Sequence, residues 1–155
     1  MMVRAPKADD WNRILEVANA SVGDVPNAGP QDEWLGNRRD FDGGVQDHFV
    51  VTEDGSVVGY GAIENTPDAP LDAYRVFIVA APETLARLGN EMYGRAAGLL
   101  ARRRAAASWF VEYAADARFV TFIQSWGYTE TRRFVHDGRQ LVVMGKQHTD
   151  ESIQT

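Results

Sequence analysis

Residues 73–113 constrain the fold more than any other part of this sequence. Ala73–Ala80 ends in the apolar run Val-Phe-Ile-Val, which is typical of a central strand covered on both faces. A long amphipathic helix is predicted over 84–106, and residues 108–113 have strand character again. Strands joined by such a helix run parallel, with a right-handed connection. The chain therefore needs a sheet that contains a parallel pair.

Two further strand pairs are predicted to be hairpins. Residues 48–52 and Ser56–Glu64 are joined at Asp54-Gly55. Residues 128–136 and 140–146 are joined at Asp137-Gly138. Asp-Gly between two apolar runs is a strong signal for a two-residue turn, so both pairs should be antiparallel. The sheet is therefore expected to be mixed.

The remaining segments complete the predicted order. Residues 3–5 form a strand, Asp9 or Asp10 caps a first helix, and 22–30 is a loop. Helices are predicted at 31–41 and 116–125. The order is β-α-α-β-β-β-α-β-α-β-β, an α/β class with a mixed α+β sheet. We expect one domain over 1–147 and a flexible polar tail at 148–155.

Composition excludes several classes of function. The chain of 155 residues has no cysteine, which rules out disulfides, thiolate metal sites and a cysteine nucleophile. Its three histidines are far apart, so we expect no metal. The net charge of −6 argues against a nucleic-acid surface. No apolar run is long enough for a membrane span or a signal peptide, so we expect a cytoplasmic protein with no membrane partner.

Three segments resemble the GNAT superfamily of acyl-CoA-dependent N-acyltransferases. The opening strand and helix are similar to the usual start, and residues 77–82 lead into the long helix as in the acyl-CoA-binding region. Residues 116–128 resemble the late signature Asn-x-Arg-Ala-x-x-Phe-Tyr-x-x-x-Gly-Phe. Arg118, Phe122, Gly127 and Tyr128 fall at its spacing. The resemblance implies a GNAT-like fold with a central, splayed sheet.

The resemblance also implies an activity and a co-substrate. An acetyl or other acyl group would move from coenzyme A to a primary amine, with acetyl-CoA as co-substrate and no metal. Backbone N–H groups around Phe77, Ile78 and Val79 would hold the pantetheine and polarise the thioester carbonyl. The diphosphate would rest where the long helix begins, since helix N-termini favour anions. The remaining cofactor-binding residues would be Thr84, Leu85, Ala86, Arg87, Leu88, Gly89, Asn90 and Asp116.

The diphosphate segment departs from the family pattern. The family's loop usually reads Arg/Gln-x-x-Gly-x-Gly/Ala, and this chain has Thr84, Arg87 and Gly89 at the matching positions. Only the last glycine is kept. Arg87 either pairs with a phosphate as a charge-assisted donor or obstructs the loop.

The candidate catalytic groups are a carboxylate and a tyrosine. The family's proton-donating tyrosine is replaced by Ile123, so the thiolate would be protonated by water, Tyr113 or Tyr128. Strand-end and helix-start carboxylates are candidate general bases for an amine, and Glu112 is the one we select with Tyr113. Trp34 would contact the acceptor, because the resemblance places its helix on the acceptor side.

Two other functions compete with the enzyme. The altered loop and the missing tyrosine favour a non-catalytic GNAT-fold module that acts in binding or regulation. An unrelated α/β binding domain could share the element order alone. For the enzyme, the acceptor would be a small-molecule or peptide amine, and the tryptophan-rich edges are compatible with a homodimer.

Overall fold

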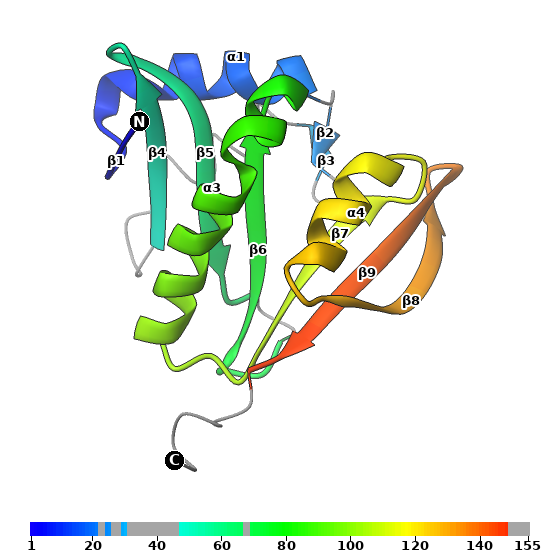
Figure 1. Ribbon diagram of the computed structural model, residues 1–155. Helices are drawn as coiled ribbons and strands as arrows, with labels where there is room; N and C mark the ends of the chain where they lie inside the picture. The colour runs from blue at the N-terminus through cyan, green and yellow to red at the C-terminus, as the bar shows by residue number, and fades with distance from the viewer. Residues whose placement is uncertain (22–23, 26–28, 31–46, 67–68, 149–155) are drawn as a thin grey trace.

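The computed structural model describes residues 1–21, 24–25, 29–30, 47–66 and 69–148. A seven-stranded sheet has the order β1-β4-β5-β6-β7-β9-β8 and opens like a V between β6 and β7 (Figure 1). Among the strands that the structure describes, only the β6–β7 pair is parallel. The predicted mixed sheet is confirmed. Its strands are β1 Met2–Arg4, β4 Asp47–Glu53, β5 Ser56–Glu64, β6 Ala73–Ala80, β7 Ala107–Tyr113, β8 Thr129–His136 and β9 Arg139–Gln147.

Helices cover both faces of this sheet. α1, Trp11–Ser21, packs on β5 and β6, and α3, Pro82–Arg102, packs on β4, β5 and β6. Their buried side chains belong to two different core clusters, one on each face. A Cβ at Gly59 would lie 2.7 Å from Cε of Met92, so the missing side chain in β5 lets α3 approach closely. Helix α4, Ala117–Ser125, lies beside β7 (Figure 1).

The helix ends differ from the prediction. α3 begins at Pro82 rather than at residue 84, because proline suits the first helical position, where no N–H is needed. It ends at Arg102 rather than at residue 106, and Arg104 has the left-handed φ of 54°. Asp10 does not cap α1. It lies in the 3-10 turn η1, Ala8–Asp10, where its carboxylate accepts the Lys7 N–H and pairs with Arg4.

Both predicted Asp-Gly hairpins are confirmed. Asp54 and Gly55 have φ of 52° and 80°, and Asp137 and Gly138 have φ of 51° and 75°. Positive φ at both central positions is the type I′ turn, whose twist matches that of the strands.

Three predicted segments have other outcomes. The expected loop 22–30 contains β2, Asp24–Val25, and β3, Gly29–Pro30, a separate ribbon too short to leave a sequence pattern. The predicted helix 31–41 lies outside the described residues. At the expected tail, the N–H of His148 donates to the Ala106 carbonyl, and 149–155 lie outside the described residues.

Within the described ranges, no helix is both long enough and apolar enough to cross a lipid bilayer.

Candidate functional site

The gap between β6 and β7 is the main irregularity of the sheet. The two strands pair only through Ala73–Arg75 of β6 and Ala107–Trp109 of β7. The next five residues of β6, 76–80, have no partner on β7 and pair with β5 alone. Alternate backbone groups of a strand point to its two sides, so part of the N–H and C=O groups of this stretch face the gap. The predicted divergence of the two strands is confirmed.

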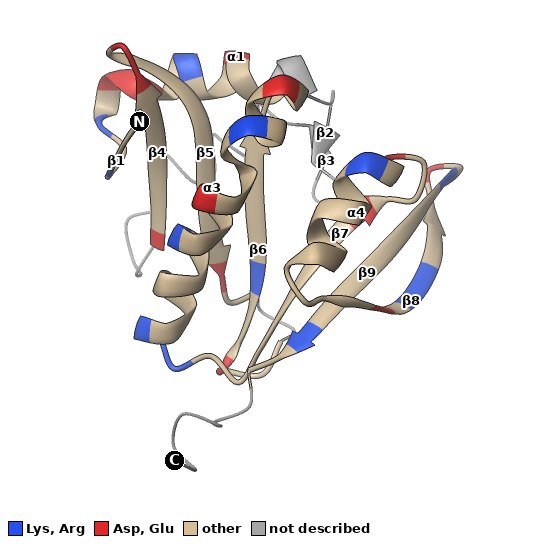
Figure 2. Ribbon diagram, viewed as in Figure 1, with Lys and Arg blue, Asp and Glu red and all other residues tan. Residues whose placement is uncertain are grey.

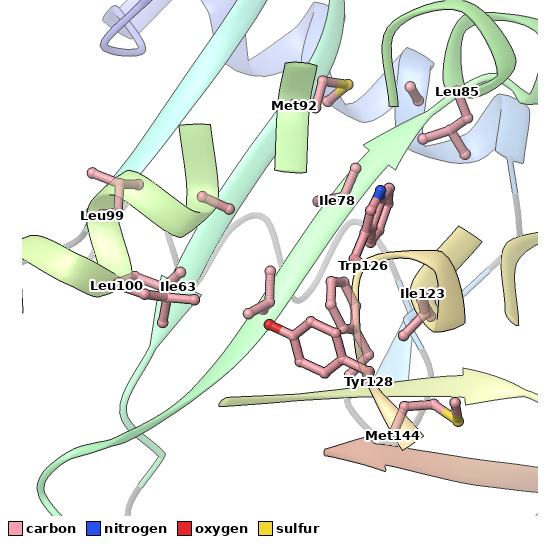
Figure 3. Close-up of a cluster of buried hydrophobic side chains, with 14 of the residues drawn as sticks. Ile63, Ile78, Leu85, Met92, Leu99, Leu100, Ile123, Trp126, Tyr128 and Met144 are labelled. Atoms are coloured by element: carbon pink, nitrogen blue, oxygen red, sulfur yellow. The ribbon is translucent and has the colours of Figure 1, made fainter. Parts of the chain in front are cut away.

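Aromatic rings fill the base of the gap on the side of α3 and α4. Figure 3 shows Trp126 and Tyr128 between β6 on one side and α4 and β7 on the other. Tyr93 of α3 stacks on Trp126, with ring centroids 4.8 Å apart and planes at 4°. Phe110 of β7 meets Tyr128 edge to face at 5.0 Å. Trp126 Nε1 donates to Oδ1 of Asn90 at 2.9 Å, which fixes the indole against α3.

A small hollow lies above these rings, between the end of β6, the first turn of α3 and the start of α4. Its volume is about 50 Å³, enough for a few water molecules. Phe119 and Phe122 of α4 are part of its wall, together with Ala80, Pro82, Leu85, Asp116 and Arg118.

Glu112 of β7 is a buried carboxylate on the part of this strand that no longer pairs with β6. The residue is only 8% exposed, and its Oε1 accepts the Tyr113 N–H at 2.9 Å. The pKa of Glu112 is raised to about 7, chiefly by burial and also by the charge of Asp116, whereas the Tyr113 N–H and the charges of Arg75 and Arg139 act in the opposite direction. A carboxylate with this pKa can accept a proton near neutral pH, which is what a general base requires.

Tyr113 is not brought together with Glu112. Successive residues of a strand point to opposite faces. Phe110, on the same face as Glu112, packs in the core beneath α3 and α4, whereas Tyr113 packs with Val111 and Leu141 on the other face. The Arg139 guanidinium lies 3.4 Å from the centroid of the Tyr113 ring. A proton transfer by Tyr113 stays a prediction.

The segment proposed for the diphosphate lies inside α3. Pro82 has no N–H, and the N–H groups of Thr84 and Leu85 both donate to the Ala81 carbonyl at 2.9 and 3.0 Å. Among the described residues this leaves the Glu83 N–H as the backbone donor of the first turn. Four of the candidate residues on α3 are buried, namely Thr84, Leu85, Leu88 and Gly89. The other three, Ala86, Arg87 and Asn90, are exposed.

Arg87 is paired with another residue of the protein. Its Nη1 and Nη2 donate to the two carboxylate oxygens of Glu53 at 2.7 Å each. These hydrogen bonds lower the pKa of Glu53 and raise that of Arg87. Arg87 follows Leu85 by two positions, about 200° around the helix, so it points away from the hollow that Leu85 lines.

The other candidate residues are distributed as follows. Phe77 and Val79 pack toward α1, and Ile78 packs toward α3. All three lie in the part of β6 that does not pair with β7. Asp116 caps α4 by accepting the Phe119 N–H at 3.2 Å, and it also lines the hollow. Trp34 lies outside the described residues.

Sequence reasoning missed a buried hydrogen-bond chain at the base of the V. Tyr93 donates to the Tyr128 hydroxyl at 3.1 Å, Tyr128 and Ser108 share a hydrogen bond of 2.6 Å, and Ser108 lies 2.6 Å from Nε2 of His148. Burial raises the pKa of Tyr128 and lowers that of His148. Tyr93 lies in α3, Ser108 in β7, Tyr128 just before β8 and His148 just after β9. They have no motif spacing, so only the fold identifies them.

The part of the chain that the structure describes contains no group of three or more His, Cys, Asp or Glu side chains that could hold a metal ion.

Comparison with known proteins places the chain among N-acetyltransferase structures by fold. No protein-family model and no curated protein sequence matches it. The Salmonella typhimurium protein yncA, solved with its cofactor acetyl-CoA, is similar at TM-score 0.76 and 18% identity, covering 97% of this chain and 95% of that one. The Escherichia coli ribosomal-protein-S18-alanine N-acetyltransferase is similar at 0.71 and 17%, covering 94% and 92%. A mutant of the Vibrio cholerae spermidine N-acetyltransferase SpeG is similar at 0.73 and 15%, covering 95% of both chains.

Proposed function

The chain has the fold of the GNAT N-acetyltransferases, and from this premise we propose that it transfers an acetyl group from coenzyme A to a primary amine. The observation that carries the proposal is Glu112, a buried carboxylate with a pKa of about 7 beside the gap between β6 and β7. The proposed acceptor is a small-molecule or peptide amine. The proposed location is cytoplasmic, which a chain without cysteine permits.

The described residues fit acetyl-CoA better at the pantetheine than at the diphosphate. The part of β6 that does not pair with β7 has N–H and C=O groups that face the gap. The extended pantetheine could hydrogen-bond to them as an additional strand would. The first turn of α3 offers the Glu83 N–H and the positive end of the helix dipole. We therefore expect acetyl-CoA to bind through the pantetheine more than through the diphosphate.

Different residues beside the gap would take part in different steps of acyl transfer. Bound acetyl-CoA supplies the thioester carbonyl that the amine attacks. Backbone N–H groups of β6 at Phe77–Val79 would donate to the carbonyl oxygen as it gains charge. Ionised Glu112 would take the proton from the attacking nitrogen while the C–N bond forms and the C–S bond breaks. Solvent would return one proton to the sulfur, so charge and atoms balance.

The proposal is tested by binding and turnover together. Calorimetric titration with acetyl-CoA should show saturable binding, and the melting temperature should rise with ligand concentration. With a panel of primary amines, thiol release should increase with pH through about 7 as Glu112 ionises. Saturable binding without thiol release for any amine in the panel would contradict the proposal.

Replacing Arg87 by alanine should leave the Kd for acetyl-CoA within about twofold of the wild-type value. The guanidinium donates to Glu53 and faces away from the hollow, so its removal should cost the ligand few contacts. The measurement is calorimetry at two salt concentrations. Binding about tenfold weaker and less salt-dependent in Arg87→Ala would mean that Arg87 leaves Glu53 for a phosphate.

A non-catalytic GNAT-fold module is the second candidate, and the first turn of α3 favours it. Two of its N–H groups are already bonded to Ala81, and the first helical residue is a proline. Such a module would release no thiol with any amine, whether it keeps a weakened acetyl-CoA site or has lost it. That result separates it from the enzyme in a single experiment.

A further inference from the structure

The buried hydrogen-bond chain at the base of the V connects the two halves of the sheet. Tyr93 belongs to α3, which packs on β4, β5 and β6, whereas Ser108, Tyr128 and His148 belong to the half formed by β7, β9 and β8. Ser108 is the middle one of the three β7 residues that pair with β6, opposite Tyr74. The chain therefore lies where β6 and β7 begin to separate.

Tyr128 is the member of the chain that lies between the two strands. Figure 3 shows its ring between β6 and β7, with the hydroxyl directed toward β6. The ring is fully buried and meets Phe110 and Tyr93 edge to face, at 5.0 and 5.8 Å between centroids. Its hydroxyl is fixed by hydrogen bonds to Tyr93 and Ser108. A buried ring fixed in this way acts as a spacer that determines how far β6 and β7 stand apart.

The chain is complete only when His148 is neutral. Nε2 of His148 then accepts the Ser108 hydroxyl, Ser108 accepts from Tyr128, and Tyr128 accepts from Tyr93, so three hydroxyl hydrogens make three hydrogen bonds. A proton on Nε2 adds a fourth hydrogen to the same three contacts. One hydrogen then has no acceptor left in the chain, and an unpaired buried donor costs more than a hydrogen bond contributes.

The surroundings of His148 keep it neutral at neutral pH. Burial lowers the pKa of His148, and the positive charge of Lys146 lowers it further. Figure 2 shows the basic segment of Lys146 near the end of β9 and further charged segments before β6 and after α3, which belong to Asp72, Arg103 and Arg104. His148 therefore becomes a cation only below the ordinary histidine pKa of 6.5.

His148 also fastens the end of β9 to the start of β7. Its backbone N–H donates to the Ala106 carbonyl at 2.8 Å, beside the last residue pair of the β7–β9 ladder. The imidazole is only partly buried, so it can turn from Ser108 to solvent once it is charged. Ser108 would then lose the acceptor that orients it, and Tyr128 would lose its fixed partner at the same time.

We propose that His148 is a positioning residue for the gap between β6 and β7. Acting through Ser108 and Tyr128, its neutral imidazole sets the separation of the two strands at which acetyl-CoA binds, and uptake of a proton by His148 weakens that binding. The effect on acetyl-CoA rests on the proposed function, whereas the coupling of His148 to Tyr128 can be tested without a ligand.

The coupling is measured by NMR titration of the ligand-free full chain from about pH 4.5 to about pH 8. The ring signals of Tyr128 should change with the same midpoint as the imidazole signals of His148. In Ser108→Ala, His148 should still titrate while Tyr128 no longer follows. In His148→Gln, whose amide oxygen can accept from Ser108 at every pH, the Tyr128 signals should show no such step.

The matched control is His136→Gln, at an exposed histidine of β8, which should leave both wild-type curves unchanged. Tyr128 signals that do not follow His148 in the wild type would overturn the proposal. A step at the same midpoint that persists in Ser108→Ala or in His148→Gln would overturn it as well.

The effect on the gap is measured by calorimetric titration with acetyl-CoA. The ratio of the Kd of the wild type to that of His148→Gln should be within about twofold of 1 at pH 8 and about 10-fold or more at pH 5, the effect of one buried donor left unpaired. The ratio cancels the titration of Glu112 and of the ligand phosphates, because both proteins share it.

The outcomes separate this proposal from the proposed function. A ratio that is the same at both pH values would overturn the positioning role and leave acetyl-CoA binding standing. Absence of binding by both proteins at both pH values would overturn the proposed function and the effect on acetyl-CoA with it. The coupling of His148 to Tyr128 would then stand or fall with the NMR titration.

Discussion

Replacing Glu112 by glutamine is expected to raise the free energy of unfolding at pH 8 by about 3 kcal/mol, the energy that corresponds to a pKa raised from 4.5 to about 7. Burial disfavours the ionised carboxylate, and glutamine fills the same space without a charge. Its amide oxygen can still accept the Tyr113 N–H that Oε1 accepts now. Denaturant unfolding of the two proteins across pH 4 to 9 measures the difference.

The direction with pH follows from proton uptake. Between about pH 4.5 and pH 7 the folded protein keeps a proton on Glu112 that the unfolded chain has lost, so wild-type stability falls as pH rises through this window and then levels off. Below pH 4.5 both states bind the proton and the two proteins should be equally stable. Glu91→Gln, on the exposed side of α3, is the matched control and should leave the pH profile unchanged. A constant offset between wild type and Glu112→Gln at all pH values would contradict the assignment.

The same substitution should remove activity, if Glu112 is the base of the proposed reaction. Glutamine cannot take a proton from the amine, so thiol release should fall about 10²- to 10⁴-fold, the usual contribution of a general base. Gain of stability with loss of turnover is the pattern expected of a residue kept for function at the expense of the fold. Gain of stability with unchanged turnover would make Glu112 a buried structural group.

The strands of this fold were predictable because local signals and long-range constraints agree. Asp54-Gly55 and Asp137-Gly138 fix two antiparallel pairs, and the strand-helix-strand unit over 73–113 fixes the parallel one. Helix ends were less predictable, since Pro82 can stop one helix or begin another and its sequence neighbours do not decide which. Strands β2 and β3 have two residues each, too few to show an alternation of apolar and polar side chains.

The candidate site was predictable only in part, because side-chain direction depends on packing. The divergence of β6 and β7 was expected and is confirmed, whereas the direction of Arg87 depends on Glu53, a residue 34 positions earlier. Glu112 and Tyr113 are adjacent in sequence and yet lie on opposite faces. The hydrogen-bond chain from Tyr93 to His148 could not be inferred, since its four members are far apart in sequence and meet only when the sheet and α3 have packed.

Replacing Trp126 by alanine is expected to destabilise the protein by about 3–5 kcal/mol, the usual range for a buried Trp or Phe reduced to alanine. Trp126 is buried, stacks on Tyr93 and contacts Phe110 and Phe122. It also joins α3 to the α4–β8 connection through Asn90. For a chain of this size the melting temperature should fall by about 10 °C.

A second variant separates the two contributions to this loss of stability, the packing of the ring and the hydrogen bond to Asn90. Trp126→Phe keeps an aromatic ring against Tyr93 but lacks the N–H that donates to Asn90, so it should lose only about 1 kcal/mol, the net value of one hydrogen bond. Calorimetric melting of both variants at one pH gives the comparison. If Trp126→Phe lost as much as Trp126→Ala, the hydrogen bond to Asn90 and not the ring packing would hold α3 and α4 together. If Trp126→Ala lost less than about 1 kcal/mol, the neighbouring rings would have to close the space, and the base of the V would be deformable enough to admit a ligand there.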